Sequence, residues 1–452
     1  MPACASQPCL RRAVKVSRIQ EPEARSQKIY TADVILPITS PPIKDGAVFV
    51  KDGRIIAIGN RDNLIAANPD EDVLEFRDAL LMPGLVNLHG HLECSSFDFL
   101  AKPAPFPKWI TKMIKASSKM QRSDWLAASR LGVKRYFEAG ITCTADITRT
   151  GLGVQAVAEA GMPGIVYLEA VAIDNNNLAD AVVDILERIK SAESVMHFGY
   201  FKLGLSPHSA YTLSESALKV CAQISKEYGL PLSIHLAETR AELELIRDGS
   251  GPLASTIGRR LELEAIKSKG SSKTPTEFLD GLALINKSLV AAHGVWLSEG
   301  DIKLLKKKNA SVALCPTSNE LLGSGEAPVN QFIKHGLRFG FGTDSIASNP
   351  DFDLFIEARK ARMLLAKQTG VKKNQIPLSP EELIKTITIK AAEVLGLSSE
   401  LGSIEPGKRA DFAVIDYDNR QPIDPYNHLI EKVSKSSVSN TILAGEVVYK
   451  RS

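Results

Sequence analysis

Two histidines flank a glycine in the segment "NLHGHLE", where His89 and His91 follow the apolar stretch "LLMPGLV". Alternate residues of an extended strand point to the same face, so both imidazoles can reach one ion. The whole chain has eight histidines in 452 residues. A His-x-His pair is weak evidence alone, because two hydrogen-bonded core histidines give the same pattern. A metal site therefore requires further ligands elsewhere in the chain.

Eight short apolar runs alternate with segments of helical periodicity along the middle of the chain. In order they are "LVNLHGH", "ITCTADIT", "GIVYLEAVAI", "YFKLGLSPHS", "LSIHLAE", "LVAAHGVW", "SVALCPTSN" and "RFGFGTDS". Segments between them, such as "SESALKVCAQISKEYG", place apolar residues at spacings of three and four, as amphipathic helices do. Eight such units favour an α/β fold, a (β/α)8 TIM-type barrel. A doubly wound open sheet is the structural alternative.

Polar residues stand at the ends of most of these runs. His89 and His91 stand at the end of the first run. The polar residues at the ends of later runs are His208 in the fourth, His235 in the fifth, His293 in the sixth, Asn319 in the seventh and Asp344 in the eighth. Each has a structural explanation when taken singly, since Asp344 could cap a helix and His208 could lie in a turn. Five of eight histidines at strand ends are hard to attribute to chance. Catalytic groups of such barrels gather at this end of the strands.

Three imidazoles and a carboxylate form a ligand set that suits zinc, with iron(II) or manganese as alternatives. We assign the ligands as His89, His91, His235 and Asp344. One coordination position is then left for water, whose pKa falls to about 7 on a bound ion. The fourth run ends in "SPHS" without a bridging carboxylate, and Lys202 lies back inside the strand, so we expect one metal ion.

Glu238 follows His235 by three residues and is a candidate general base at the top of the fifth strand. The alternative is a surface glutamate that opens the charged helix "ETRAELELIRD". The three histidines away from strand ends, His197, His335 and His428, are interpreted as structural or surface residues.

Both ends of the chain are rich in β patterns. In "GAVFVKDGRIIAIG", Val48, Val50, Ile55 and Ile58 flank an Asp-Gly turn, which predicts a hairpin. Similar runs return in "GKRADFAVIDYD" and "NTILAGEVVYK". We predict a small β-sandwich domain from residues 29–83 and 403–452, a barrel domain over 84–402, and a basic, disordered tail over 1–28.

The charge and composition of the chain limit the classes of partner that it can bind. The chain has 55 Lys and Arg against 52 Asp and Glu, which gives no support to nucleic acid or an anionic membrane as partner. The six cysteines include no CxxC pair, which argues against a zinc ribbon or a disulfide framework. No apolar run approaches the roughly 20 residues of a membrane-spanning helix. We expect a cytoplasmic protein.

The motifs resemble a known family. "MPGLVNLHGHLE", "SPHSAYTLS", "SIHLAE", "AHGVWL", "CPTSN", "GTDS" and "LGSIEPGKRADFAV" are similar, in order and spacing, to the amidohydrolase superfamily, in its branch of adenosine-type deaminases and chlorohydrolase-like enzymes. The resemblance runs from about Ile29 to the C-terminus. Within that branch, "FPKWI", "KTPTEFLD" and "GTDSIASNPDFDLFIEAR" look most like aminodeoxyfutalosine deaminases, and next like methylthioadenosine/S-adenosylhomocysteine deaminases.

The resemblance implies the same four metal ligands and adds roles for other residues. Glu238 would carry a proton from water to the purine ring nitrogen, and Asp344 would help to move protons toward the departing ammonia. His293 would orient the attacking hydroxide. The implied substrate contacts are His208, Glu93, Asn319 and Trp109, the last by stacking. The family usually has Thr in place of Gly90 and often Cys or Ser in place of Gly294, departures that bear on substrate detail.

The expected activity is hydrolytic deamination of a 6-aminopurine nucleoside, aminodeoxyfutalosine of menaquinone biosynthesis, to its 6-oxo product and ammonia. The alternatives are methylthioadenosine, S-adenosylhomocysteine, another aminated heterocycle or a chlorinated triazine as substrate, and a non-catalytic barrel scaffold. The P-C-x-x-C motif of cytidine-type deaminases does not occur, since Cys315-Pro316 has the reverse order and is isolated. The resemblance also implies a homodimer.

Overall fold

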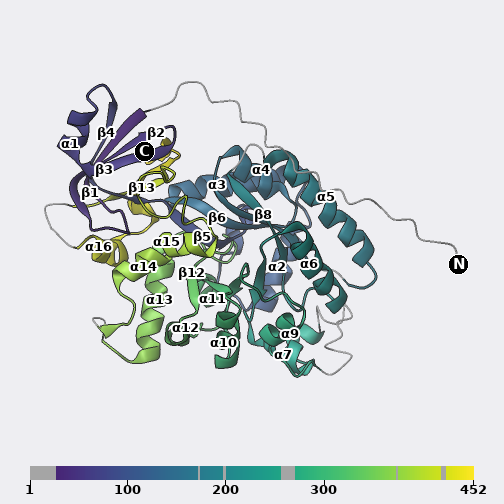
Figure 1. Ribbon diagram of the computed structural model, residues 1–452. Coiled ribbons are helices and arrows are strands. Elements are labelled where there is room, and N and C mark those ends of the chain that lie inside the picture. The colour runs from purple at the N-terminus through teal and green to yellow at the C-terminus, as the bar shows by residue number, and fades with distance from the viewer. Residues whose placement is uncertain (1–26, 172–173, 197–199, 256–269, 373–374, 419–423) are drawn as a thin grey trace.

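Eight parallel strands form the centre of the molecule (Figure 1). The computed structural model describes residues 27–171, 174–196, 200–255, 270–372, 375–418 and 424–452. The central strands are β5 (Leu85–Gly90), β6 (Ile141–Thr148), β7 (Gly164–Ala170), β8 (Phe201–Pro207), β9 (Ser233–Leu236), β10 (Val290–His293), β11 (Ser311–Leu314) and β12 (Arg338–Phe341). All eight predicted strands are confirmed, although residues 172 and 173 of the third run lie outside the described part.

The eight strands make two four-stranded sheets that meet at both edges. One sheet has the order β5-β6-β7-β8 and the other β12-β11-β10-β9. Parallel bridges pair Gly90 with Asp344, and Leu205 with Leu232, so β5 adjoins β12 and β8 adjoins β9. The strands therefore close into a ring, the TIM-type barrel that the sequence predicts.

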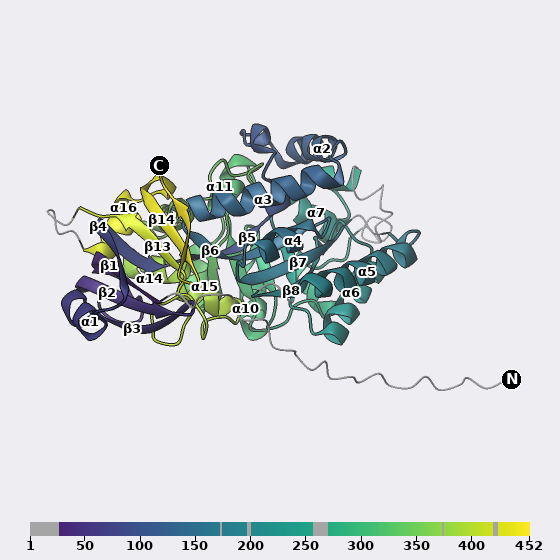
Figure 2. The same cartoon turned by 90° about the horizontal axis from the view of Figure 1, so that it is seen from above.

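Helices cover the outside of the barrel (Figure 2). They are α2 (Phe106–Ser117), α3 (Arg122–Glu138), α4 (Leu152–Glu159), α5 (Leu178–Met196), α6 (Glu215–Tyr228), α7 (Arg240–Asp248), α9 (Pro275–Gly281), α10 (Glu299–Lys307), α11 (Pro316–Leu321), α12 (Val329–His335), α13 (Leu354–Thr369), α14 (Pro380–Thr386) and α15 (Ile389–Val394). Helices α4, α5 and α6 pack against β6, β7 and β8. No helix of the described ranges is both long and apolar enough to cross a bilayer.

The two chain ends share one mixed sheet of seven strands, in the order β15-β14-β13-β4-β1-β2-β3 (Figure 1). Its strands are β1 (Gln27–Ile35), β2 (Ile43–Lys51), β3 (Arg54–Asn60), β4 (Asp72–Pro83), β13 (Phe412–Asp416), β14 (Val438–Leu443) and β15 (Glu446–Lys450); helices α1 (Arg61–Ala67) and α16 (Pro425–Lys432) accompany it. Antiparallel pairing of β4 with β13 joins the two ends. Because β1 begins at Gln27, the last two residues of the predicted tail lie in a strand, and the rest of the tail lies outside the described residues.

The predicted hairpin is confirmed between β2 and β3. Val50 pairs with Ile55 and Lys51 with Arg54 across the turn. Asp52 and Gly53, the two turn residues, have φ values of 53° and 72°. Two successive left-handed residues define the tight turn that matches strand twist, which explains why Asp-Gly is found there.

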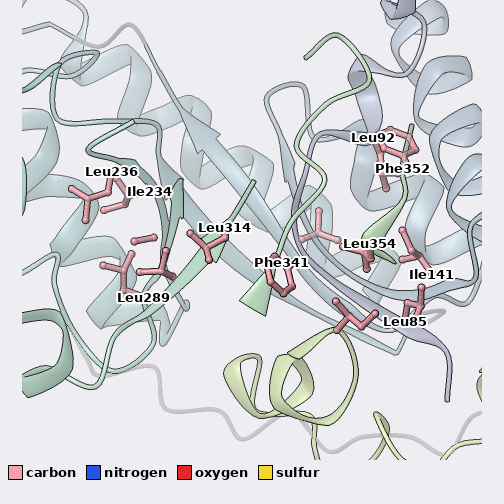
Figure 3. Close-up of a cluster of buried hydrophobic side chains, with 14 of the residues drawn as sticks. Leu85, Leu92, Ile141, Ile234, Leu236, Leu289, Leu314, Phe341, Phe352 and Leu354 are labelled. Atoms are coloured by element: carbon pink, nitrogen blue, oxygen red, sulfur yellow. The ribbon is translucent and has the colours of Figure 1, made fainter. Parts of the chain in front are cut away.

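A continuous apolar core lies between the barrel strands and their surroundings (Figure 3). Leu85, Ile141, Ile234 and Leu314 contribute to it from four different strands, and all are fully buried. Consecutive residues of β6 and β7 are buried on both faces, as expected of parallel strands that have a core inside and helices outside.

The seam between β5 and β12 is unusually close. A Cβ atom placed on Gly342, just after β12, would lie 2.5 Å from the Cβ of His89 and 2.9 Å from its backbone nitrogen. The Asp344 amide donates a hydrogen bond to the His89 carbonyl, at 3.0 Å, across the same seam. The absence of a side chain at Gly342 therefore allows the first and last barrel strands to meet.

Replacing Gly342 by Ala is expected to lower the free energy of unfolding by about 3 kcal/mol, because backbone atoms of His89 cannot move away cheaply. Chemical denaturation measures this loss. Gly300→Ala in α10 is the control, since its nearest neighbour would be 3.6 Å away, and its stability should be unchanged or slightly higher. Equal stability of the two variants would contradict the tight seam.

Candidate metal and catalytic site

The four predicted ligands converge at the C-terminal end of the barrel. His89 lies in β5, His91 directly follows it, His235 lies in β9, and Asp344 follows β12. The Nε2 atoms of His89 and His91 are each 3.6 Å from Asp344 Oδ1. The Nε2 atoms of His91 and His235 are 3.3 Å apart. The four side chains therefore form one continuous cluster, in which His91 contacts both Asp344 and His235.

The imidazoles are neutral in this environment. His235 Nδ1 lies 3.0 Å from the His208 carbonyl oxygen, which can only accept, so Nδ1 carries the proton and Nε2 keeps its lone pair. Burial lowers the pKa values of His89 and His235 below the ordinary value, and lowers that of His91 to about 3. Neutral imidazoles are the form that binds metal ions.

Asp344 is held as an anion by several donors. Its Oδ2 accepts hydrogen bonds from Ser318 Oγ at 2.6 Å and Ser348 Oγ at 2.8 Å, and its Oδ1 accepts the Ser345 amide at 2.7 Å. Burial alone would raise the pKa of Asp344, but the His89 imidazole 3.6 Å away and the other nearby histidines hold that pKa well below the usual range. The two serine hydroxyls hold Oδ2, and Oδ1 faces His89 and His91.

The arrangement fits a divalent metal ion. Both ring nitrogens of His89 are buried and lack a hydrogen-bond partner among the described residues. An imidazole so placed loses hydration without compensation unless a ligand occupies the space. His89, His91 and Asp344 present ligand atoms within 4.8 Å of one another, as do His89, His235 and His293. Neutral nitrogen donors with one carboxylate match zinc and similar ions.

Glu238 lies beside this ligand cluster with a perturbed pKa. Its side chain is buried, and desolvation raises its pKa to about 7, with smaller effects of His293 and Asp344. The backbone amides of Ala237 and Glu238 both donate to the carboxylate of Glu242, at 3.0 and 2.9 Å. Ala237 has a left-handed φ of 51°. Glu242 therefore positions the turn that carries Glu238.

His293 and Asn319 are brought together by the fold. His293 Nδ1 is 2.9 Å from Asn319 Oδ1, and its ring centre is 5.4 Å from that of His89. His293 has a left-handed φ of 72°, a strained conformation for a residue with a Cβ. Asn319 thus orients His293 in the structure, and its predicted contact with substrate stays a prediction.

His208 stacks on His235, with ring centres 4.5 Å apart and an interplanar angle of 26°. Its Nδ1 lies 3.1 Å from the hydroxyls of both Ser209 and Thr212. The ring is therefore fixed at the edge of the ligand cluster, at the end of the fourth strand.

Glu93 and Trp109 are anchored within the protein. The Glu93 carboxylate accepts hydrogen bonds from the backbone amides and hydroxyls of the segment after β6, including the Arg149 amide at 2.7 Å and the Thr150 hydroxyl at 2.8 Å. Trp109 Nε1 donates to the Ala347 carbonyl at 2.8 Å, and its ring packs near Phe106. Both residues brace loops at the barrel mouth, and their contact with substrate stays a prediction.

The remaining histidines lie away from the cluster. His335 ends α12 and contacts Glu299 at 3.2 Å, and His428 in α16 lies 2.9 Å from the Asp416 carbonyl oxygen. His197 lies outside the described residues.

Several residues of the site escaped the sequence interpretation. They are Asp146, Glu169, Glu242, Ser318 and Ser348. Asp146 accepts the Leu92 amide at 2.7 Å and so supports the backbone just beyond His91. A carboxylate inside an otherwise apolar run, as in "CTADIT" and "YLEAV", was the available signal for two of them.

Comparison with known proteins shows the family to which the chain is similar. A model of the Amidohydrolase family matches residues 80–448. A 5-methylthioadenosine/S-adenosylhomocysteine deaminase of Pyrococcus furiosus is 30% identical over 407 residues, 89% of this chain and 90% of the relative. A 5'-deoxyadenosine deaminase of Methanobrevibacter smithii is 30% identical over 430 residues, 93% and 92% of the two chains.

Solved structures share the fold. An adenosine deaminase from Xanthomonas campestris with bound zinc superposes with a TM-score of 0.79 at 22% identity, over 93% of this chain and 92% of the other. Helicobacter pylori aminofutalosine deaminase, in complex with methylthio-coformycin, gives a TM-score of 0.77 at 20% identity, over 94% and 100%.

Replacement of His91 by Asn is expected to reduce bound zinc from about one ion per chain to a small fraction, because one of four ligands is lost. Elemental analysis of protein dialysed against trace zinc measures the stoichiometry. His335→Asn is the matched control and should retain the metal. Full zinc content in the His91 variant would contradict the ligand assignment.

Proposed function

Because the chain belongs to the amidohydrolase family, we propose that it hydrolyses the exocyclic amino group of a 6-aminopurine nucleoside in a metal-dependent reaction. The chain is a hydrolase of carbon–nitrogen bonds, of the adenosine-deaminase type. The nucleoside's identity and the dependence on zinc are the parts that we propose.

The observation that carries the proposal is the position of Glu238 beside the four converging ligands. Hydrolytic deamination requires a nucleophile made from water, a proton on a ring nitrogen, and a proton for the departing amine. A carboxyl group with a pKa of about 7 can both accept and deliver a proton near neutral pH. A buried carboxyl group with a displaced pKa beside a histidine cluster is typical of a functional site.

The side chains divide the work of the reaction. A zinc ion held by His89, His91, His235 and Asp344 would supply water activation at neutral pH. Glu238 takes the proton from the attacking water and delivers it to the ring nitrogen, which makes C6 electrophilic.

His293, fixed by Asn319, orients the attacking oxygen through its ring. Asp344 accepts a proton and passes it toward the leaving amine, while Ser318 and Ser348 keep its carboxylate in place. His208, fixed through its Nδ1, contacts the purine.

Aminodeoxyfutalosine is the substrate that we favour, with its product directed to menaquinone biosynthesis. The segments "FPKWI", "KTPTEFLD" and "GTDSIASNPDFDLFIEAR" support this choice through their resemblance to aminodeoxyfutalosine deaminases. The similarity to the Helicobacter pylori enzyme supports the shared fold alone.

Methylthioadenosine and S-adenosylhomocysteine are the second candidate substrates. The relatives at about 30% identity that are named as methylthioadenosine/S-adenosylhomocysteine deaminases favour them. All candidates share the 6-aminopurine and differ in the group at the 5' carbon, so the chemistry at Glu238 is the same for each.

Glu238→Gln is expected to reduce kcat about 1,000-fold while leaving bound zinc unchanged, because the amide cannot carry the proton. Ammonia release and metal analysis on the same preparation measure both quantities. Glu244→Gln, in the helix α7 that follows Glu238 and paired with Arg240, should keep its activity. Near-normal turnover by the Glu238 variant would rule out the proton transfer.

Aminodeoxyfutalosine should be deaminated with a kcat/KM at least tenfold above those of methylthioadenosine, S-adenosylhomocysteine and 5'-deoxyadenosine. A panel of these nucleosides, assayed for ammonia with the zinc-loaded protein, measures the order. A higher kcat/KM for methylthioadenosine would replace the favoured substrate with the second candidate. Ammonia release from none of them would overturn the proposed function.

A further inference from the structure

Glu169 is a buried carboxylate that the reaction scheme leaves unused. It lies near the end of β7, the third barrel strand, and only 8% of the residue is exposed. No residue of the described ranges donates a hydrogen bond to its carboxylate. By contrast, the carboxylates of Glu93 and Glu242 each accept several backbone amides. The Glu169 oxygens are not among the fully buried atoms that lack a partner, so they face open space from which a ligand can donate hydrogen bonds.

The carboxylate is directed toward the reaction site. Ligand atoms of Glu169, His208 and His235 lie within 4.8 Å of one another. A second metal ion is a poor occupant, because both nitrogens of His235 are already engaged: Nδ1 donates to His208 and Nε2 faces His91. Glu169 and His208 alone would give a cation only two protein ligands, fewer than a stable site uses. Hydroxyl groups of an organic ligand are better partners.

The order of the strands indicates which part of a nucleoside would reach Glu169. Glu238 follows the fifth strand, His208 ends the fourth and Glu169 ends the third, and β7 pairs with β8 directly. A purine with C6 at Glu238 and its ring beside His208 extends its opposite side toward the third strand. That side carries N9 and the sugar. The 2' and 3' hydroxyls are adjacent donors that one carboxylate can accept together.

The charges around Glu169 agree with such a role. Desolvation and the neighbouring Glu93 raise its pKa to about 7, while Arg149 and Arg188 oppose that rise. His208 and His235 face it from β8 and β9. The two arginines act through their charge, and among the described residues neither donates a hydrogen bond to the Glu169 carboxylate.

We propose that Glu169 is a substrate-binding residue whose carboxylate accepts hydrogen bonds from the sugar hydroxyls of the purine nucleoside. The assignment rests on the proposed deaminase function and extends it to the sugar. It predicts that the protein selects ribonucleosides over sugars that lack these hydroxyls, whatever group the 5' carbon carries.

The test compares adenosine with 2',3'-dideoxyadenosine as substrates of the zinc-loaded wild-type protein and of Glu169→Gln. The wild-type protein should prefer adenosine by on the order of 100-fold in kcat/KM, since hydrogen bonds to a charged group contribute about 1.5–3 kcal/mol. Glu169→Gln should reduce that preference at least tenfold, mainly by slowing adenosine. Its kcat/KM for the dideoxy compound should change less than threefold.

Control variants distinguish a role of Glu169 in substrate binding from a role in protein structure. Glu169→Asp keeps the charge and should retain part of the preference, and Glu187→Gln, an exposed glutamate of α5, should retain all of it. Zinc content and thermal denaturation establish that each variant is folded. A structural role of Glu169 would instead lower the rates of both nucleosides equally, and that result would overturn the assignment.

The two proposals fail in different ways. If the wild-type protein deaminates adenosine and Glu169→Gln shows an undiminished preference, only the role of Glu169 is wrong. If the zinc-loaded wild-type protein releases ammonia from neither compound and from none of the panel nucleosides, the proposed function itself is wrong.

Discussion

The hydrogen bond between the Asp344 amide and the His89 carbonyl is the contact on which the site depends. It closes the barrel between its last and first strands, and the same two residues supply two of the four candidate metal ligands. Any shift of β12 against β5 would move Asp344 away from His89 and His91. Gly342 makes the close approach possible, because any side chain there would overlap His89. The geometry of the candidate ligands therefore depends on the closure of the barrel. The ring of strands is the rigid frame that a precise site requires.

Polar groups at the centre of this frame are costly to bury. Most of them form a hydrogen bond with a partner in the protein. Asn319 bonds His293, Ser318 bonds Asp344, and Glu242 accepts the amide of Glu238. Each partner leaves one face of the functional side chain free toward the same point. The atoms that stay uncompensated, such as the ring nitrogens of His89, mark where an ion or substrate would complete the hydrogen bonding.

Two carboxyl groups in this small volume have pKa values displaced in opposite directions. Burial raises the pKa of Glu238 to about 7, whereas the neighbouring histidines hold the pKa of Asp344 well below its ordinary range. Such separation allows Glu238 to exchange protons near neutral pH, while Asp344 begins the reaction ionised and can act as a ligand before it receives a proton. The two pKa values differ because the two carboxyl groups have different surroundings. Hydroxyl and amide donors reach Asp344, and its carboxylate faces the imidazoles. The carboxyl of Glu238 is chiefly desolvated.

The sequence by itself determined the strand order, the residues at strand ends and the hairpin at Asp52, because these depend on local periodicity and turn chemistry. It thereby predicted that the four candidate ligands and Glu238 lie at one end of the barrel, since their positions follow once the strands are parallel and end on one side. Only the tertiary structure decided which side chains face one another across strands. The engagement of Glu93 by the segment after β6, and the open carboxylate of Glu169, depend on contacts between residues far apart in the chain. Local sequence patterns do not determine the register between strands, because that register is set by the packing of the whole ring.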